Sequence, residues 1–341
     1  MLTDSTDIHV GRRTPQGHVP RGGPAFSVAW PDGVDALLFG VLGVHAEQDG
    51  GLAADQVVRV VERTQRHAPV LVERARHRRV DGTVDEVLLC YWVDRDAAEG
   101  WWRDVDQWWA DTAPDGVGIW VQLTETPLSR HETSYSNPHA TIGLAAVGKL
   151  YPTDVHDYSG AALDRMPEDP LDPDRLPLWE HRDQVDGAVR SLPGRARCVI
   201  RTEQDWSAAP PQQAEAYLTQ VQPTLDAAVR RLQEPSAARE LRCVAAMPLQ
   251  LVDLDTGAAM ARTAVIAWFE DAEALEKWAA SEPTHLAILG AFFTALAGPF
   301  GAELAITLWH EVGLPAQLLT ATRGAGHPYL PVALDEDRPA V

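Results

Sequence analysis

Tyr91-Trp-Val-Asp-Arg-Asp-Ala-Ala-Glu-Gly-Trp-Trp102 has a counterpart later in the chain, Ala267-Trp-Phe-Glu-Asp-Ala-Glu-Ala-Leu-Glu-Lys-Trp278. When the two stretches are aligned, Trp92 falls on Trp268 and the tryptophans that end them coincide. In each copy an apolar run gives way to charged residues and then to a helical pattern, which is typical of a corner between a strand and a helix. The match favours an internal duplication, in which both halves of the chain share one fold.

The patterns around these two stretches predict the element order β-α-β-β-α-β in each half. In the first half we expect strands at 35–44, 69–75, 86–92 and 116–123, and helices at 57–67 and 96–110. In the second half we expect strands at 196–201, 241–252, 259–269 and 304–312, and helices at 212–231 and 271–296. Pro223 and Pro283 should kink or break the two later helices, because proline cannot donate a helical hydrogen bond.

Modules with this element order are ferredoxin-like. The sequence therefore predicts an α+β protein in which duplicated ferredoxin-like (βαββαβ) modules form a fold of the dimeric α+β barrel type. The expected segments are an irregular N-terminal arm at 1–24, a first module at 25–136, a connecting segment and pocket wall at 137–195, a second module at 196–315 and a C-terminal tail at 316–341.

Composition narrows the class of partners. The 341 residues carry a formal net charge of −20, which argues against nucleic acid and anionic membranes, since both attract positive surfaces. Three cysteines without metal-ligand spacing, together with an N-terminus that lacks an apolar signal region, favour a reducing cytoplasm. The uncharged stretch 286–302 is near the lower length limit for a membrane span and contains Gly298 and Pro299, so we expect a buried helix there.

Two histidines in the second half stand out. His285 follows Pro283 at the start of an apolar helix, and the spacing predicts Ile288, Leu289 and Phe292 on roughly the same helical face. His310 ends an apolar strand. A neutral imidazole is a good iron ligand and a titratable one is a good acid or base. Taken alone, however, a histidine beside an apolar face is more often an ordinary core residue.

Five segments, in order along the chain, resemble motifs of the haem-containing aldoxime dehydratases. They are Glu132-Thr-Ser-Tyr135, Tyr158-Ser-Gly-Ala-Ala-Leu-Asp-Arg-Met-Pro167, Ile200-Arg-Thr-Glu-Gln-Asp-Trp206, Glu276-Lys-Trp-Ala-Ala-Ser-Glu-Pro-Thr-His-Leu286 and Leu308-Trp-His-Glu-Val312. The fourth is similar to the family segment that bears the proximal haem ligand, and the fifth to the segment that bears the distal catalytic histidine. The resemblance extends from about residue 30 to the end of the chain.

The resemblance implies that the protein converts an aldoxime to a nitrile and water with a haem b that is ferrous in the active state. It implies His285 as the axial ligand of the iron, with Ile288, Leu289 and Phe292 against the porphyrin. It implies His310 as the distal acid and base, and a homodimer as the assembly.

The same resemblance implies roles for three more side chains. Arg165 and Thr202 would hold the hydroxyl group of the substrate, and Glu132 would assist on the distal side. Position 202 departs from the family pattern, which has serine there. The threonine methyl group restricts χ1 and takes up space, so the rate or the accepted substrate size should differ. Without the family, Arg165 would be interpreted as an interface or surface residue, Glu132 as a solvated residue and Thr202 as an ordinary strand residue.

Two other functions fit the same residues. A haem peroxidase-like enzyme of similar α+β architecture, as in dye-decolourising peroxidases and chlorite dismutases, would use the pair of His310 and Arg165 to cleave an O–O bond. A non-enzymatic barrel that binds haem or another small ligand would not need His310 at all. Whether the substrate is an aryl or an aliphatic aldoxime does not follow from the sequence.

Overall fold

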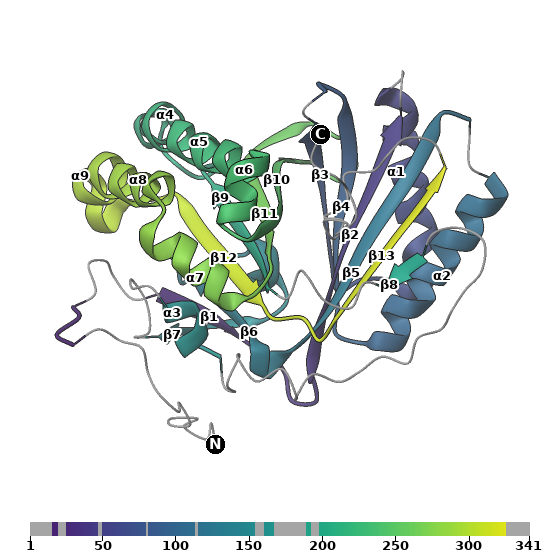
Figure 1. Cartoon of the computed structure of the whole chain (residues 1–341), viewed down its shortest axis with the longest axis horizontal. Coiled ribbons are helices and arrows are strands. Elements are labelled where there is room, and N and C mark those ends of the chain that lie inside the picture. The colour runs from purple at the N-terminus through teal and green to yellow at the C-terminus, as the bar shows by residue number, and fades with distance from the viewer. Residues whose placement is uncertain are drawn as a thin grey trace.

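The structure is a computed structural model, and it describes residues 16–19, 25–46, 50–79, 81–112, 115–153, 160–166, 189–191 and 198–324. Within these ranges thirteen strands form one continuous sheet, in the order β7-β1-β6-β12-β9-β11-β10-β3-β4-β2-β5-β13-β8. Figure 1 shows the helices of the two halves on opposite outer sides of the molecule, with the strands between them. The protein is thus a mixed helix-and-sheet fold, as the sequence predicted.

The first half supplies four neighbouring strands and two helices. These are β2 (Ala36–Ala46), α1 (Gly50–Arg63), β3 (Leu71–Arg78), β4 (Val84–Trp92), α2 (Arg95–Thr112) and β5 (Val117–Pro127), with the strands in the order β3-β4-β2-β5. Helix α1 buries Val57 and Val60 completely. Val58, between them, is 37% exposed. Helix α2 buries Trp101, Trp108 and Trp109, so the tryptophan-rich stretch is core packing.

The second half repeats the arrangement with interrupted helices. Its elements are β9 (Cys198–Asp205), α4 (Pro211–Ala216), the π-helix η5 (Tyr217–Val221), α5 (Gln222–Gln233), α6 (Pro235–Glu240), β10 (Cys243–Val252), β11 (Ala259–Phe269), α7 (Ala272–Ser281), α8 (Pro283–Phe292), the π-helix η6 (Phe293–Ala297), α9 (Gly298–Phe300), the 3-10 helix η7 (Gly301–Glu303) and β12 (Thr307–Gly313). The strands lie in the order β12-β9-β11-β10. Both predicted breaks occur. A π-helical turn directly precedes Pro223, and Pro283 begins a new helix.

The two halves meet edge to edge and pack face to face. Strand β3 pairs with β10, with Ala75 opposite Leu251. The sheet faces that point away from the helices share one apolar core, in which Tyr91 and Trp120 of the first half lie with Met247 and Trp309 of the second. Separate apolar cores lie between each set of helices and its own strands. A site between strand and helix in the second half is therefore isolated from the first half by the shared core.

Several elements were absent from the sequence prediction. They are β1 (Ala25–Ala29), β6 (His131–Tyr135), β7 (Lys149–Thr153), β8 (Val189–Ser191), β13 (Gln317–Gly324), the short helix α3 (Ala161–Asp164) and the 3-10 helices η2 (Leu128–Arg130) and η3 (Gly143–Ala146). The 3-10 helix η1 (Thr64–His67) forms the end of the helix expected at 57–67. β13 lies in the expected tail and pairs with β5. β6 follows β5 in sequence yet pairs with β12 of the second half. The rest of the expected arm, connecting segment and tail falls mostly outside the described residues.

The prediction of a buried helix at 286–302 was wrong. None of the residues of α8 is buried, and Leu286 and Leu289 are 45% and 44% exposed. Pro283–Glu303 is the one helical segment in the described ranges that is long and apolar enough to cross a membrane, and only 11% of it is buried. The apolar composition of α8 is therefore not explained by contacts within the chain.

Candidate active site

Three adjacent strands, β9 and β12 of the second half and β6 beside them, present the predicted polar residues on their helix-covered face. In the ladder between β12 and β9, His310 lies directly opposite Thr202. In the ladder between β12 and β6, His310 lies opposite Ser134. Glu132 precedes Ser134 by two positions, so its side chain emerges from the same face. Strand pairing thus brings together residues that are 178 positions apart, Glu132 and His310.

Arg165 completes this group from the end of α3. Its Nε donates a hydrogen bond to Glu132 Oε2 at 2.6 Å, and its Nη2 lies 3.2 Å from His310 Nε2. Glu132 Oε1 also lies 3.2 Å from His310 Nε2. The side chains of Arg165 and Glu132 are only 6% and 1% exposed. Both are therefore buried and paired, and neither is a surface residue.

Glu132 remains ionised in this setting. Burial by itself would raise the pKa of its carboxyl group, but the charge of Arg165 and then that of His310, together with their hydrogen bonds, lower the pKa to about 2. A permanent carboxylate beside an imidazole and a guanidinium gives the site a fixed negative charge.

The imidazole of His310 has a partner in either protonation state. A guanidinium has only donors, so Arg165 Nη2 donates to an unprotonated His310 Nε2. Glu132 Oε1 lies 3.2 Å from that same nitrogen. A proton added to Nε2 would therefore find a carboxylate oxygen within reach. This arrangement suits a histidine that alternates between acid and base.

Thr202 has a neighbour that the sequence analysis missed. Gln204 Nε2 donates a hydrogen bond to Thr202 Oγ1 at 3.1 Å. The two residues lie two positions apart on β9, so both side chains are on the face of His310. The sequence gives no signal of this contact, because a glutamine in a strand is equally common as a solvated residue.

His285 projects from the first turn of α8, across a break from α7. Its Nδ1 lies 2.9 Å from the carbonyl oxygen of Ala279, to which it donates, and its ring lies 4.2 Å from that of Trp278 between centroids. In the described part of the chain Nε2 has no hydrogen-bond partner. Burial lowers the pKa of His285, and the nearby charge of His310 lowers it further. The imidazole is therefore neutral, with its Nε2 lone pair available.

The predicted apolar wall beside His285 is uneven. Ile288 and Phe292 are half-buried, and Leu289 is largely exposed. Phe292 and Leu308, which lies two positions before His310 on β12, both pack against the same buried cluster. The wall therefore reaches from the helix toward the strand that carries the other histidine.

These residues fit a haem. A neutral imidazole whose second nitrogen is held by a backbone carbonyl is the usual form of an iron-ligating histidine. An apolar helix with no buried residue offers surface for a porphyrin. In the described ranges no cluster of three or more His, Cys, Asp or Glu residues forms a separate metal site.

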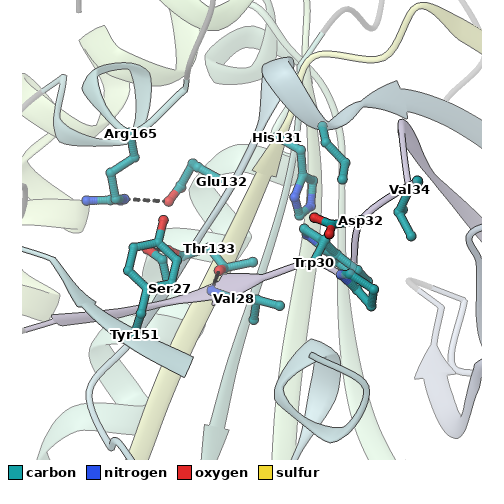
Figure 2. Close-up of a pocket in the computed structure, with 13 residues that line it drawn as sticks. Ser27, Val28, Trp30, Asp32, Val34, His131, Glu132, Thr133, Tyr151 and Arg165 are labelled. Carbon is teal, nitrogen blue, oxygen red and sulfur yellow. Dashed lines mark hydrogen bonds and ion pairs between the residues drawn. The ribbon is translucent and has the colours of Figure 1, made fainter. Parts of the chain in front are cut away.

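A pocket of about 400 Å³ lies on the other side of the pair of Glu132 and Arg165. Its walls come from residues 30–34 and from β1, β6 and β7, three strands that the sequence did not predict. They include Trp30, His131 and Tyr151. In Figure 2 the hydroxyl group of Tyr151 points toward Arg165 and Glu132. Glu132 and Arg165 therefore also border a cavity whose lining does not include Thr202 or His310.

The opposite face of β9 and β12 carries a buried ionic network. Arg201 is fully buried, and its Nη2 contacts Glu73 at 2.5 Å and Glu203 at 2.6 Å. Arg262 pairs with the same two carboxylates. The guanidinium of Arg201 also lies over the ring of Trp309, next to His310 in sequence. This network stabilises β9 and β12 from the face opposite the site.

Comparisons with known proteins identify the family of the chain. The model of a family described as haem-containing dehydratase matches residues 38–317. The phenylacetaldoxime dehydratase of Bacillus sp. (strain OxB-1) is 29% identical over 316 residues, which cover 89% of this chain and 88% of the relative. The aliphatic aldoxime dehydratase of Pseudomonas chlororaphis is 26% identical over 319 residues, which cover 89% of this chain and 88% of the relative.

Two crystal structures share the fold. One, of an aldoxime dehydratase, superimposes with a TM-score of 0.78 at 24% identity and covers 93% of this chain and 92% of its own. The other, of an aldoxime dehydratase in complex with butyraldoxime, has a TM-score of 0.76 at 23% identity and covers 92% of this chain and 90% of its own. Nearly the whole described chain thus has a counterpart in solved structures.

Proposed function

The chain belongs to the haem-containing dehydratase family, and we propose that it converts an aldoxime, R–CH=N–OH, to a nitrile and water. The relatives named above act on phenylacetaldoxime and on aliphatic aldoximes, which defines the substrate class to test. The observation that carries the proposal is the presence of two histidines with different surroundings. His285 is neutral with a free Nε2, and His310 lies in an ion-paired group close enough to influence the pKa of His285.

His285 holds the iron of the haem through Nε2 in this proposal, and the face of α8 with Ile288, Leu289 and Phe292 covers the porphyrin. A ferrous haem b would supply electron density to the oxime nitrogen and so weaken the N–O bond. The dehydration is redox-neutral overall, so no reductant is consumed.

The residues on the strand face move the protons. The oxime N–O bond breaks, and the departing oxygen takes a proton from Nε2 of His310 and leaves as water. The unprotonated Nε2 then takes the proton from the oxime carbon while the third bond between carbon and nitrogen forms. His310 is thereby restored, and the atoms balance. Glu132 stabilises the protonated imidazole, and Arg165 donates to the unprotonated one.

Thr202 and Arg165 orient the substrate oxygen. Thr202 faces the same space as His310 from the neighbouring strand, and its hydroxyl group can donate to the oxime oxygen. A positioned donor in a site shielded from water lowers the barrier as negative charge develops on that oxygen. Glu132 acts through its contacts with His310 and Arg165.

The same proposal covers the architecture and the setting of the enzyme. The strand orders β5-β2-β4-β3 and β12-β9-β11-β10 support two ferredoxin-like modules, at 25–136 and 196–315, that form a dimeric α+β barrel-type fold. The segments at 1–24, 137–195 and 316–341 are then an arm, a pocket wall and a tail. We also propose a cytoplasmic homodimer with neither nucleic acid nor membrane as partner, which the charge of −20 supports.

The direct test is product analysis. Haem is supplied, the protein is reduced without oxygen, and phenylacetaldoxime or butyraldoxime is added. We expect the corresponding nitrile from the native protein and a loss of at least about 100-fold in the His310→Ala variant, which should keep its haem. Peroxide turnover without any nitrile would favour the peroxidase-like function instead. Haem binding without either reaction would favour the non-enzymatic one.

A further inference from the structure

A line of polar side chains runs from the candidate site into the helical layer. Gln204 Nε2 lies 3.1 Å from Thr202 Oγ1, and Gln204 Oε1 lies 3.3 Å from Thr263 Oγ1. The hydroxyl oxygens of Thr263 and Tyr217 are 3.5 Å apart. Gln204 is only 7% exposed and Tyr217 is fully buried. Gln204 and Tyr217 therefore have little access to water that could replace their contacts.

Strand pairing fixes the positions of its members. Gln204 lies directly opposite Thr263 on β11 and opposite Leu308 on β12. Two positions before Gln204 on β9, Thr202 lies opposite His310. Tyr217 approaches from the π-helix η5 and stacks near Trp206 with 4.9 Å between ring centroids. Because the contacts join residues on paired strands and on the helix packed against them, the position of the Gln204 amide group is fixed.

The direction of the hydrogen bonds follows from the donors available. Burial raises the pKa of Tyr217 to about 12, so its hydroxyl group keeps its proton and can donate to Thr263. Thr263 then donates to the carbonyl oxygen Oε1 of Gln204. That contact directs the NH₂ end of the amide toward Thr202.

The consequence for Thr202 concerns its single proton. A hydroxyl group has one donor and two acceptor positions, and Gln204 occupies an acceptor position of Thr202. Among the described residues the proton of Thr202 has no acceptor. It is therefore left to point into the space that Thr202 shares with His310. If an oxygen instead of the NH₂ group faced Thr202, the proton would be drawn away from that space.

We propose that Gln204 is a positioning residue that fixes Thr202 as a hydrogen-bond donor toward the hydroxyl oxygen of the substrate. This inference rests on the proposed dehydration of aldoximes. Thr263 and Tyr217 act behind Gln204 by setting the direction of its amide. The chain thus holds its threonine hydroxyl in the donating state before substrate arrives, which reduces the reorganisation needed during the reaction.

The test is a double-mutant cycle in the haem-loaded enzyme. Gln204→Leu removes the donor to Thr202, Thr202→Val removes the hydroxyl group, and the third variant carries both changes. We expect Gln204→Leu to lower kcat between about 5- and 10-fold with little change in KM. The reason is that the variant loses one hydrogen bond that stabilises mainly the transition state. In the Thr202→Val background the same change should cost less than about 2-fold.

Two further variants separate positioning from folding. Thr263→Val leaves the contact between Gln204 and Thr202 but removes the group that directs the amide, so it should lower kcat in the same direction by less. Gln213→Leu is the matched control. Gln213 is a buried glutamine on α4 whose amide contacts only the backbone of residues 303 and 305, so its loss should reduce stability and leave kcat unchanged.

A spectroscopic readout makes the inference testable without turnover. Carbon monoxide bound to the reduced haem reports on hydrogen-bond donors in the distal pocket through its stretching frequency. Gln204→Leu should shift that frequency in the same direction as Thr202→Val, with no additional shift in the double variant. Equal losses of kcat in both backgrounds, or a carbon monoxide frequency that Gln204→Leu leaves unchanged, would overturn the inference. Failure of the native protein to form nitrile would refute the proposed dehydration, while the carbon monoxide shifts would still decide the role of Gln204.

Discussion

The Nδ1 atom of His285 donates a hydrogen bond to the carbonyl oxygen of Ala279, 2.9 Å away on the preceding helix. Ala279 lies in the last turn of α7, where carbonyl groups have no partner within the helix. The break at Pro283 folds α8 back so that this carbonyl meets the imidazole. One contact thereby satisfies a free backbone group, selects the tautomer of His285 and leaves Nε2 available for iron.

Substitution of Glu132 should destabilise the native protein in a pH-dependent way. Its pKa of about 2 lies below the ordinary value of 4.5, so the ionised carboxylate stabilises the fold by about 3 kcal/mol at neutral pH. That contribution is complete above pH 4.5 and is lost as the pH falls toward 2. We expect Glu132→Gln to lower the free energy of unfolding in urea by a similar amount at pH 7, and by a little under half of that amount at pH 3.

The matched control for Glu132 is Glu99→Gln. Glu99 pairs with Arg95 one helical turn away on α2, and its side chain is 40% exposed. Exposed pairs of this kind contribute at most about 0.5 kcal/mol. An equal loss for both variants at pH 7 would contradict the buried pairing of Glu132.

Two substitutions at position 202 should distinguish the effect of the threonine hydroxyl group from that of its methyl group. Thr202→Ser keeps the donor and removes a methyl group, so we expect kcat within about 3-fold of the native enzyme, whereas Thr202→Val should lose at least about 30-fold. The ratio of phenylacetaldoxime to butyraldoxime turnover should rise in the serine variant, because space beside the oxime increases. Steady-state nitrile formation measures all three effects. Equal activity of the valine variant would exclude Thr202 from the reaction.

The ionic network behind the site should be essential for stability. Arg201→Met leaves Glu73 and Glu203 buried with Arg262 as their shared cation, and we expect the free energy of unfolding to fall by about 3 to 5 kcal/mol. Arg95→Met, at a residue that is 45% exposed, should change it by less than about 0.5 kcal/mol. Urea unfolding of the two variants compares them directly. If Arg201→Met left the free energy of unfolding unchanged, apolar packing could replace the network.

Much of the fold was predictable from sequence because hydrophobic periodicity is a local signal. The strands that carry His310 and Thr202, and the break before His285, follow from apolar runs and from proline chemistry. Strand β6, which carries Glu132, was not predictable in this way. Its sequence His-Glu-Thr-Ser-Tyr is polar, and its burial depends on pairing with β1 and β12, far away in the chain.

The site itself was predictable in part, and the missing part depends on tertiary contacts. The residues that the family resemblance placed in the site include Glu132, Arg165 and His310, and the structure brings these three within hydrogen-bond distance of one another. Gln204 was missed because its role depends on the pairing of β9 with β11. The exposure of α8 was also missed, because an apolar helix that covers a cofactor has the same composition as one that covers a protein core.

The central claim is that His285 binds the iron of a haem and that His310, on the other side of this haem, acts as the acid and base of the reaction. Titration of the protein with hemin, followed by the absorbance of the Soret band, tests this most directly. We expect the native protein and the His310→Ala variant to bind about one haem per chain, and the His285→Ala variant to lose the band. A native protein that stays colourless with hemin, or a His285→Ala variant with a full and unchanged Soret band, would contradict the claim.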